Sequence, residues 1–311
     1  MKKVGFIFPG QGSQRVGMGQ SFIDSNSNNQ QLFQQADDLL GFSLSEIMLE
    51  GPEEKLTKTS YAQPALLLVS TLIYRELLDA GIRPTVLAGH SLGEYSALVA
   101  AGVLSFEEAL ILVHQRGKLM EEAYPDGDGG MAAVLGLDQA TIESKLSTLS
   151  ELVDIANLNC PGQIVISGEK SGIEQAINSL KEAGAKRVIP LNVSGPFHSR
   201  LMKPAAERFE QILENLEFSE ASTAIYSNVT AEKTTNAAQL KELLVKQLYS
   251  PVKFHEIIEQ LLNDDLDALV EVGSGKVLTG LVKKVSRRAT VFSVQDDSSL
   301  QTFIDWYQGG E

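Results

Sequence analysis

The chain has 311 residues, of which 43% are hydrophobic and 21% are charged, a composition typical of a folded globular protein and not of a disordered one. Its 26 basic and 40 acidic residues give a net charge of −14, which argues against binding to nucleic acid or to an anionic membrane surface. A single cysteine, Cys160, excludes a disulfide framework, and the lack of a signal-peptide core or an apolar run of about 20 residues predicts a cytoplasmic protein that spans no membrane.

Apolar runs that end in glycine-rich turns and lead into amphipathic helices recur in both terminal parts of the chain, which is typical of an α/β fold with a mainly parallel sheet. In chain order, we predict a strand at 4–8, a mostly buried helix at 61–80, a strand at 85–88, helices at 92–101 and 106–123, a strand at 268–272 and a helix at 277–285. We expect these elements to form a large subdomain like that of the α/β-hydrolases.

The middle of the chain shows a different order of elements. It predicts a strand at 131–135, a helix at 139–149, a hairpin of strands at 153–158 and 163–167, a helix at 172–183 and a strand at 186–193. The order βαββαβ is the ferredoxin-like pattern. We therefore predict a large subdomain made of residues 1–126 and 196–311, and a small ferredoxin-like subdomain, residues 127–195, inserted into it.

The pentapeptide Gly89-His90-Ser91-Leu92-Gly93 lies between a predicted strand and a predicted helix, which is the setting of a G-x-S-x-G nucleophile elbow. There the helix dipole and the N–H of Leu92 would favour a negative charge that develops beside Ser91. The alternative is that Ser91 and Glu94 only form a capping box at the start of the helix. The two glycines, which a cap does not need, favour the catalytic interpretation.

His198 is the best candidate for the base that would activate this serine. It follows Gly195-Pro196 in a loop that leaves a strand end, where the sites of α/β sheets gather. No acid stands out as a third triad member, but the helix that begins near residue 237 ends close to Gln247, whose carbonyl could accept a hydrogen bond from the imidazole. Of the other histidines, His90 adjoins the serine on a sharp turn, where neighbouring side chains point different ways, and His114 and His255 are interpreted as structural or surface residues.

Arg116 lies on the apolar stripe of the predicted helix at 106–123. An arginine in such a place either extends its charged end to solvent or finds a partner, because a buried unpaired charge is costly. The functional interpretation is that it faces the cleft above Ser91 and binds a substrate carboxylate through both of its terminal nitrogens. That would select an acyl group with a carboxylate of its own.

Motifs along nearly the whole chain carry a family resemblance. They are, in order, Phe8-Pro9-Gly10-Gln11-Gly12-Ser13-Gln14, Gly89-His90-Ser91-Leu92-Gly93-Glu94-Tyr95-Ser96, Gln115-Arg116-Gly117, Asn159-x-Pro161-Gly162-Gln163, Gly195-Pro196-Phe197-His198 with Leu201-Met202-Lys203-Pro204, and Gln247-Leu248-Tyr249-x-Pro251-Val252. The chain resembles the malonyl-CoA:acyl-carrier-protein transacylases of bacterial fatty acid synthesis.

The resemblance implies a ping-pong reaction. Ser91 would take the malonyl group from malonyl-CoA and pass it to the phosphopantetheine thiol of an acidic acyl carrier protein, with His198 as base and acid. It further implies an oxyanion hole built from the backbone N–H groups of Gln11 and Leu92.

Substrate contacts also follow from the resemblance. Arg116 would pair with the malonyl carboxylate, the carbonyl of Gln247 would orient the histidine, and Gln63 and Asn159 would lie near the site. The bulky Phe197 would narrow the acyl pocket in favour of an unbranched malonyl group. We expect a monomer with no bound cofactor and no metal ion, for which malonyl-CoA is a substrate.

Other functions remain open at this level. The chain could be an α/β-hydrolase-type esterase or thioesterase, a stand-alone trans-acting acyltransferase of a polyketide pathway, or a non-catalytic carrier-binding module. Residues 273–294 contain several cations and no acid, which is either a solvated helix face or a docking surface for the carrier. Basic residues near the presumed cleft are equally plausible as the docking surface for the carrier. The docking candidates are Lys186, Arg187, Arg200, Lys203, Lys276, Lys283, Lys284, Arg287 and Arg288.

Overall fold

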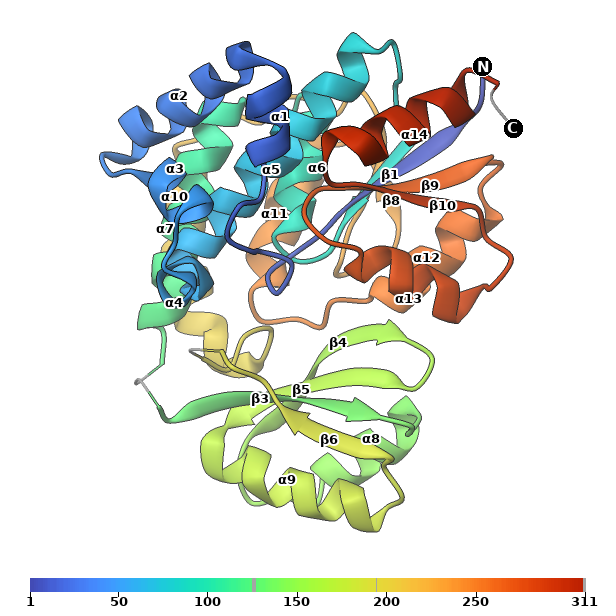
Figure 1. Ribbon diagram of the computed structural model, residues 1–311. Coiled ribbons are helices and arrows are strands. Elements are labelled where there is room, and N and C mark those ends of the chain that lie inside the picture. Colours follow the sequence, from blue (N-terminus) through green and yellow to red (C-terminus); the bar gives the residue numbers. More distant parts are fainter. Residues whose placement is uncertain (125–126, 194, 310–311) are drawn as a thin grey trace.

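The computed structural model describes residues 1–124, 127–193 and 195–309 (Figure 1). The sheet of the large subdomain has the strand order β10-β9-β1-β2-β7-β8. Its strands are β1 (Val4–Phe8), β2 (Val86–Gly89), β7 (Ile225–Tyr226), β8 (Lys233–Thr234), β9 (Ala268–Val272) and β10 (Val291–Val294). Five of these strands run parallel, and β8 pairs antiparallel with β7. The predicted fold class, an α/β fold with a mainly parallel sheet, is confirmed.

Helices cover both faces of this sheet because successive side chains of β1 point into two different apolar cores. Phe6 and Phe8 lie in the core that also holds side chains of α5 (Thr59–Asp79), α6 (Gly93–Ala100) and α7 (Phe106–Glu122). Ile7 lies in the opposite core, with α12 (Phe254–Asn263) and α13 (Val277–Val285). Further helices are α1 (Gln20–Ser25), α2 (Gln30–Leu40), α3 (Leu44–Leu49), α4 (Glu53–Thr57), α10 (Lys203–Glu214), α11 (Ala237–Gln247) and α14 (Asp297–Tyr307), with 3-10 turns at Ser27–Asn29 and Arg200–Met202.

A second sheet lies below the first in Figure 1 and has the order β4-β5-β3-β6, with antiparallel neighbours. Its strands are β3 (Gly129–Leu135), β4 (Val153–Cys160), β5 (Gln163–Glu169) and β6 (Arg187–Pro190). Helices α8 (Gln139–Leu146) and α9 (Lys170–Glu182) share an apolar core with one of its faces. Met131 and Val165 instead join the core of the large subdomain. This sheet therefore packs against α8 and α9 on one face and against the large subdomain on the other. This is the βαββαβ arrangement expected of a ferredoxin-like subdomain.

Most predicted elements agree with the structure to within a few residues, and β1, β9 and α13 have the predicted bounds. Helix α8 is shorter than predicted and ends at Leu146, and β6 is confined to the residues that pair with β3. The predicted boundary at residue 126 lies outside the described residues. Among the described residues, no helix combines the length and apolar character needed to cross a bilayer.

Candidate active site

Ser91 sits on a sharp turn between β2 and α6. Its φ angle is 50°, a left-handed conformation that is uncommon outside glycine. The turn is possible because glycines flank it: a Cβ on Gly89 would lie 1.9 Å from the carbonyl carbon of Gly93, and one on Gly93 would lie 2.0 Å from the carbonyl oxygen of Phe8. The predicted elbow is therefore present, and its glycines are required by backbone contact.

The capping-box interpretation of Ser91 and Glu94 is wrong. Helix α6 has no side-chain cap, because the left-handed serine turns its hydroxyl away from the helix. The main-chain N–H of Ser91 instead donates to Oδ1 of Asn228 at 2.7 Å. The Glu94 carboxylate accepts from the side chain of Gln247 and from the main-chain N–H of Asn228. Both residues thus belong to a network beneath the elbow.

His198 lies beside the serine. Its Nε2 is 2.8 Å from Ser91 Oγ, and its Nδ1 is 2.7 Å from the main-chain oxygen of Gln247. Since a carbonyl can only accept, Nδ1 must carry the proton, which leaves Nε2 free to accept the serine proton. Burial and the nearby charge of Arg116 lower the pKa of His198 to about 3, so the imidazole is neutral and can act as a base.

The guanidinium of Arg116 does not extend to solvent, since the residue is 1% exposed. Nη1 donates to Gln63 Oε1 at 2.7 Å, and Nη2 donates to Gln247 Oε1 at 2.9 Å and to Ser91 Oγ at 3.3 Å. The ring of Tyr95 lies against it, with its centroid 5.1 Å from the guanidinium carbon. A buried arginine with amide and hydroxyl partners keeps its positive charge, which makes it ready to pair with an anion.

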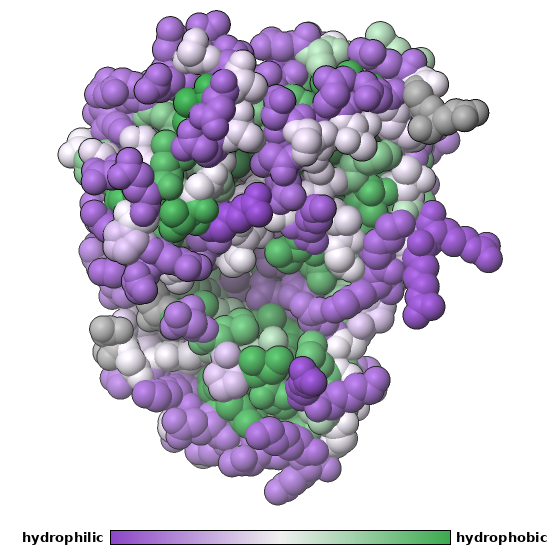
Figure 2. Space-filling view, in the orientation of Figure 1, coloured by the Kyte–Doolittle hydropathy of each residue, from purple (hydrophilic) through white to green (hydrophobic). Residues whose placement is uncertain are grey.

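These groups open onto a cleft of about 430 Å³ between the two subdomains. Figure 2 shows the hollow, with apolar side chains gathered on the side of the small subdomain. Of the predicted site residues, those that line the cleft are Gln11, Ser91, Leu92, Arg116, Asn159, Phe197 and His198. Gln63 and Gln247 lie behind it and contact Arg116.

Two of the lining residues are held by neighbours. Oδ1 of Asn159 accepts a hydrogen bond from His90 Nε2 at 2.8 Å, so the residue before the serine reaches across to the small subdomain. The side chain of Gln11 donates to Thr59 Oγ1 at 3.1 Å. Within the described part of the chain, no group of three or more His, Cys, Asp or Glu side chains is placed to hold a metal ion.

Asn228 is a site residue that the sequence reasoning missed. It follows the short strand β7, which lies next to β2 in the sheet, and it is fully buried. Its Nδ2 donates to the carbonyl of Gly89 at 2.6 Å, and its Oδ1 accepts from Ser91, so that one amide holds both ends of the elbow turn. Its place at the carboxyl end of a strand could not serve as a signal in the sequence, because β7 has only two residues.

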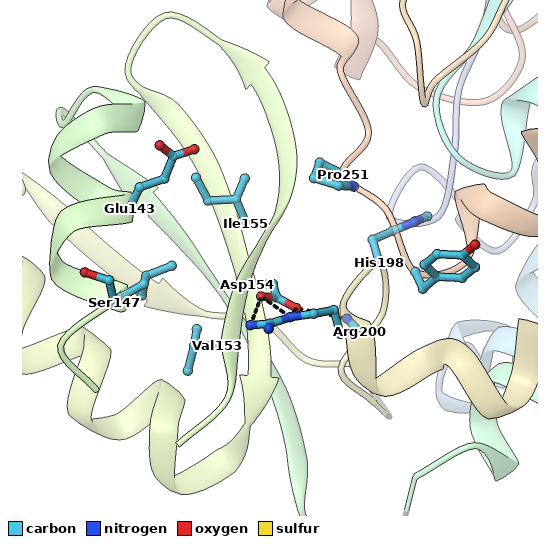
Figure 3. A pocket seen from close by; sticks show the side chains of 10 residues that line it. Glu143, Ser147, Val153, Asp154, Ile155, His198, Arg200 and Pro251 are labelled. Atoms are coloured by element: carbon cyan, nitrogen blue, oxygen red, sulfur yellow. Dashed lines mark hydrogen bonds and ion pairs between the residues drawn. The ribbon is translucent and has the colours of Figure 1, made fainter. Parts of the chain in front are cut away.

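A second pocket, of about 400 Å³, lies on the other side of His198 (Figure 3). There Arg200 forms a bidentate ion pair with Asp154, in which its Nε and Nη2 donate to the carboxylate oxygens at 2.8–3.0 Å. Its main-chain N–H also donates to the same carboxylate at 2.9 Å. The loop that carries His198 is thereby tied to β4 of the small subdomain, and this docking candidate is already engaged in an ion pair.

The other docking candidates are exposed. Lys283 donates to the carbonyl of Ala289 at 2.7 Å, and Lys284 donates to Oε1 of Gln163 at 2.6 Å, near the cleft. The Lys203 ammonium lies over the ring of Tyr249, at 5.9 Å from its centroid. The remaining exposed candidates are Lys186, Arg187, Lys276, Arg287 and Arg288.

A serine at a strand-to-helix elbow, hydrogen-bonded to an imidazole and placed beside a buried cation, is the arrangement of enzymes that move acyl groups through an acyl-serine. The chain belongs to the acyltransferase family, because the acyl transferase domain matches residues 5–302. It is 49% identical to the malonyl CoA-acyl carrier protein transacylase of Bacillus subtilis (98% of this chain, 97% of that protein). It is 46% identical to that of Haemophilus influenzae (96% of this chain, 97% of that protein).

Solved structures of transacylases are similar to this chain along nearly its whole length. An acyl carrier protein S-malonyltransferase from Vibrio cholerae has a TM-score of 0.94 and 43% identity, over 97% of this chain and 99% of that one. A malonyl-transacylase in complex with a type II PKS acyl-carrier protein has a TM-score of 0.95 and 42% identity, with the same coverage.

Proposed function

We propose that the chain transfers the malonyl group from malonyl-CoA to the phosphopantetheine thiol of an acyl carrier protein in fatty acid biosynthesis. The observation that carries this proposal is the buried Arg116, whose Nη2 lies 3.3 Å from Ser91 Oγ. A cation at that distance from the nucleophile suits a short acyl group that ends in a carboxylate. The names of the relatives support the same substrate and acceptor.

The first half of the reaction loads the serine. Ser91 Oγ would attack the thioester carbonyl while its proton passes to Nε2 of His198. The carbon–sulfur bond of malonyl-CoA then breaks, the coenzyme A thiolate takes the proton from the imidazolium, and the malonyl group remains on Ser91 as an ester. The carbonyl of Gln247 would stabilise the imidazolium through Nδ1–H.

The second half of the reaction transfers the malonyl group from Ser91 to the carrier. Nε2 of His198 would take the proton of the carrier's thiol, whose sulfur attacks the malonyl ester, and would return that proton to Ser91 Oγ as the carbon–oxygen bond breaks. We assign the oxyanion in each half to the main-chain N–H groups of Gln11 and Leu92, the second of which lies at the start of α6. Both residues line the cleft.

Three further residues are proposed to shape the acyl site. Gln63 would hold the guanidinium of Arg116 through its hydrogen bond to Nη1. Phe197, on the cleft wall, would leave room for an unbranched acyl group, and Asn159 would offer its amide to the substrate while His90 holds its oxygen.

Transfer is favoured over the esterase alternative. An α/β-hydrolase-type esterase uses an acid as the third triad member, whereas Nδ1 of His198 faces a carbonyl. The buried Arg116 would also have no purpose for neutral esters. The proposed site is complete within one chain and needs no second copy, and we propose a monomer. We further propose that it acts in the cytoplasm without a bound cofactor.

Intact mass spectrometry tests the proposal. The protein mixed with malonyl-CoA alone should gain the mass of one malonyl group, and the adduct should disappear when a phosphopantetheinylated carrier protein is added. The unmodified carrier, which has no thiol arm, is the control and should leave the adduct in place. Carriers from fatty acid and polyketide pathways should be compared, since one solved neighbour is bound to a polyketide carrier. Loss of the malonyl group to water at the same rate with and without carrier would disprove transfer.

The carrier should dock on the exposed cations of α13 and the following turn. We expect Lys284→Glu with Arg287→Glu to raise the KM for the carrier about tenfold, because opposite charges steer such encounters, and to leave the KM for malonyl-CoA within about twofold. The increase should shrink at high salt. Lys170→Glu with Lys181→Glu, an equivalent double reversal at exposed positions of α9, is the control. Equal increases for both substrates would contradict a carrier-specific surface.

A further inference from the structure

Glu94 is a buried acid to which the proposed chemistry gives no role. The residue is 1% exposed, and burial raises the pKa of its carboxyl to about 7. Its Oε2 accepts from Gln247 Nε2 at 2.7 Å and from the main-chain N–H of Asn228 at 3.1 Å. A carboxyl group in such a place is costly unless hydrogen bonds hold it, and both donors here belong to residues that also contact Ser91.

The side-chain amide of Gln247 has one orientation that satisfies all its neighbours. Its Oε1 accepts from Arg116 Nη2 at 2.9 Å, and a guanidinium can only donate. Its Nε2 donates to Glu94 and, at 3.1 Å, to the carbonyl of Ser91. If the amide turned over, its NH₂ would face the guanidinium and its oxygen would face the carboxyl group. Glu94, through the shortest of these hydrogen bonds, therefore acts together with the carbonyl of Ser91 to keep Oε1 of Gln247 toward Arg116.

Gln247 serves both halves of the site. Its main-chain oxygen holds His198, and its side-chain oxygen holds Arg116. We infer that Glu94 is a positioning residue that, through the side-chain amide of Gln247, holds the guanidinium of Arg116 in line for the substrate carboxylate. This inference rests on the proposed role of Arg116 in malonyl binding.

The role assigned to Glu94 is geometric, and conservative replacements can separate it from a charge effect. The side-chain oxygen of glutamine can accept the same two hydrogen bonds, so Glu94→Gln should keep Gln247 in place. Leucine has a similar size but no acceptor, so Glu94→Leu removes the 2.7 Å hydrogen bond of Gln247 Nε2 and leaves the longer one, at 3.1 Å, to the carbonyl of Ser91, which loosens the amide.

The readout is the ratio of kcat/KM for malonyl transfer to kcat/KM for acetyl transfer, measured together with Tm. Glu94→Leu should lower this ratio about tenfold, whereas Glu94→Gln should stay within about threefold of the original protein. Glu271→Leu is the matched control, because Glu271 is a buried carboxylate that accepts two main-chain N–H groups at the start of α13. It should lower Tm and leave the ratio unchanged.

Two comparisons can overturn the inference. In a Gln247→Ala background, which keeps the main-chain oxygen for His198, Glu94→Leu should change the ratio by less than about twofold; a full further loss would show that Glu94 does not act through Gln247. Equal losses in both transfers, with a lower Tm as in Glu271→Leu, would mean a purely structural role.

Arg116→Ala, measured in parallel, separates this inference from the proposed function. If it abolishes the preference for malonyl while Glu94→Leu keeps it, the positioning role alone is wrong. If Arg116→Ala keeps the preference, the assignment of the carboxylate to Arg116 fails, and the role of Glu94 fails with it.

Discussion

Ser91→Ala is expected to lower malonyl transfer by about 10⁵-fold and to abolish the malonyl adduct, because Ser91 Oγ is the atom that would carry the acyl group. The loss should exceed that of any other single substitution in the cleft. Transfer rates with purified carrier protein and intact mass spectra with malonyl-CoA alone measure the two effects.

The fold should survive this change, since the N–H of Ser91 and not its hydroxyl holds the elbow to Asn228. An unaltered Tm would establish this. Ser144→Ala, at an exposed position of α8, is the control and should keep both the adduct and the rate. A carrier-binding module without catalysis predicts that the Ser91→Ala protein retains full function.

Arg116→Ala is expected to lower kcat/KM for malonyl transfer about 100- to 1,000-fold, because the substrate carboxylate would lose a buried partner that donates two hydrogen bonds. Acetyl transfer should change little or rise, because the variant keeps the burial that lowers the pKa of His198 but loses the charge that lowers it further. Competition between malonyl-CoA and acetyl-CoA gives the ratio directly.

Arg116→Lys should give an intermediate ratio of malonyl to acetyl transfer, since a lysine keeps the positive charge but cannot form the bidentate hydrogen bonds of a guanidinium. Arg208→Ala, which removes an exposed arginine paired with Glu122 on the surface, controls for the loss of a positive charge. A preference for malonyl that persists in the Arg116→Ala protein would disprove the carboxylate contact.

The parts of the fold that could be predicted are those with long or fully apolar elements. Strand β1 consists of five buried apolar residues, and α7 has 17 residues with a capping box at its start, so each leaves a clear pattern. By contrast, β7 and β8 have two residues each, too few for any periodicity. Helices α1, α3 and α4 have five or six residues each, too few for a sustained apolar stripe. Helix α2 is amphipathic and buries Leu32, Phe33 and Ala36, but no element was predicted there.

Sequence patterns predict the site residues to a similarly limited extent. Ser91, His198 and Arg116 could be proposed because each sits next to a recognisable element, and the structure brings them together. Glu94 was misinterpreted because the capping box rests on residue types alone, whereas the strained turn of the elbow gives the serine three residues earlier a left-handed backbone. Asn228 could not be found because its place beneath the elbow depends on β7 lying next to β2, a strand order that spacing along the chain does not determine.

The proposed contact of Arg116 with the substrate carboxylate would couple the choice of substrate to the strength of the base. Burial and the charge of Arg116 keep the pKa of His198 low, so the neutral imidazole is a weak base. A carboxylate bound to the guanidinium would cancel that charge and make the imidazole more basic. His198 would then become a stronger base only when an acyl group with a carboxylate is bound. An acyl group without a carboxylate would lack the contact with Arg116 and would also react beside a weaker base.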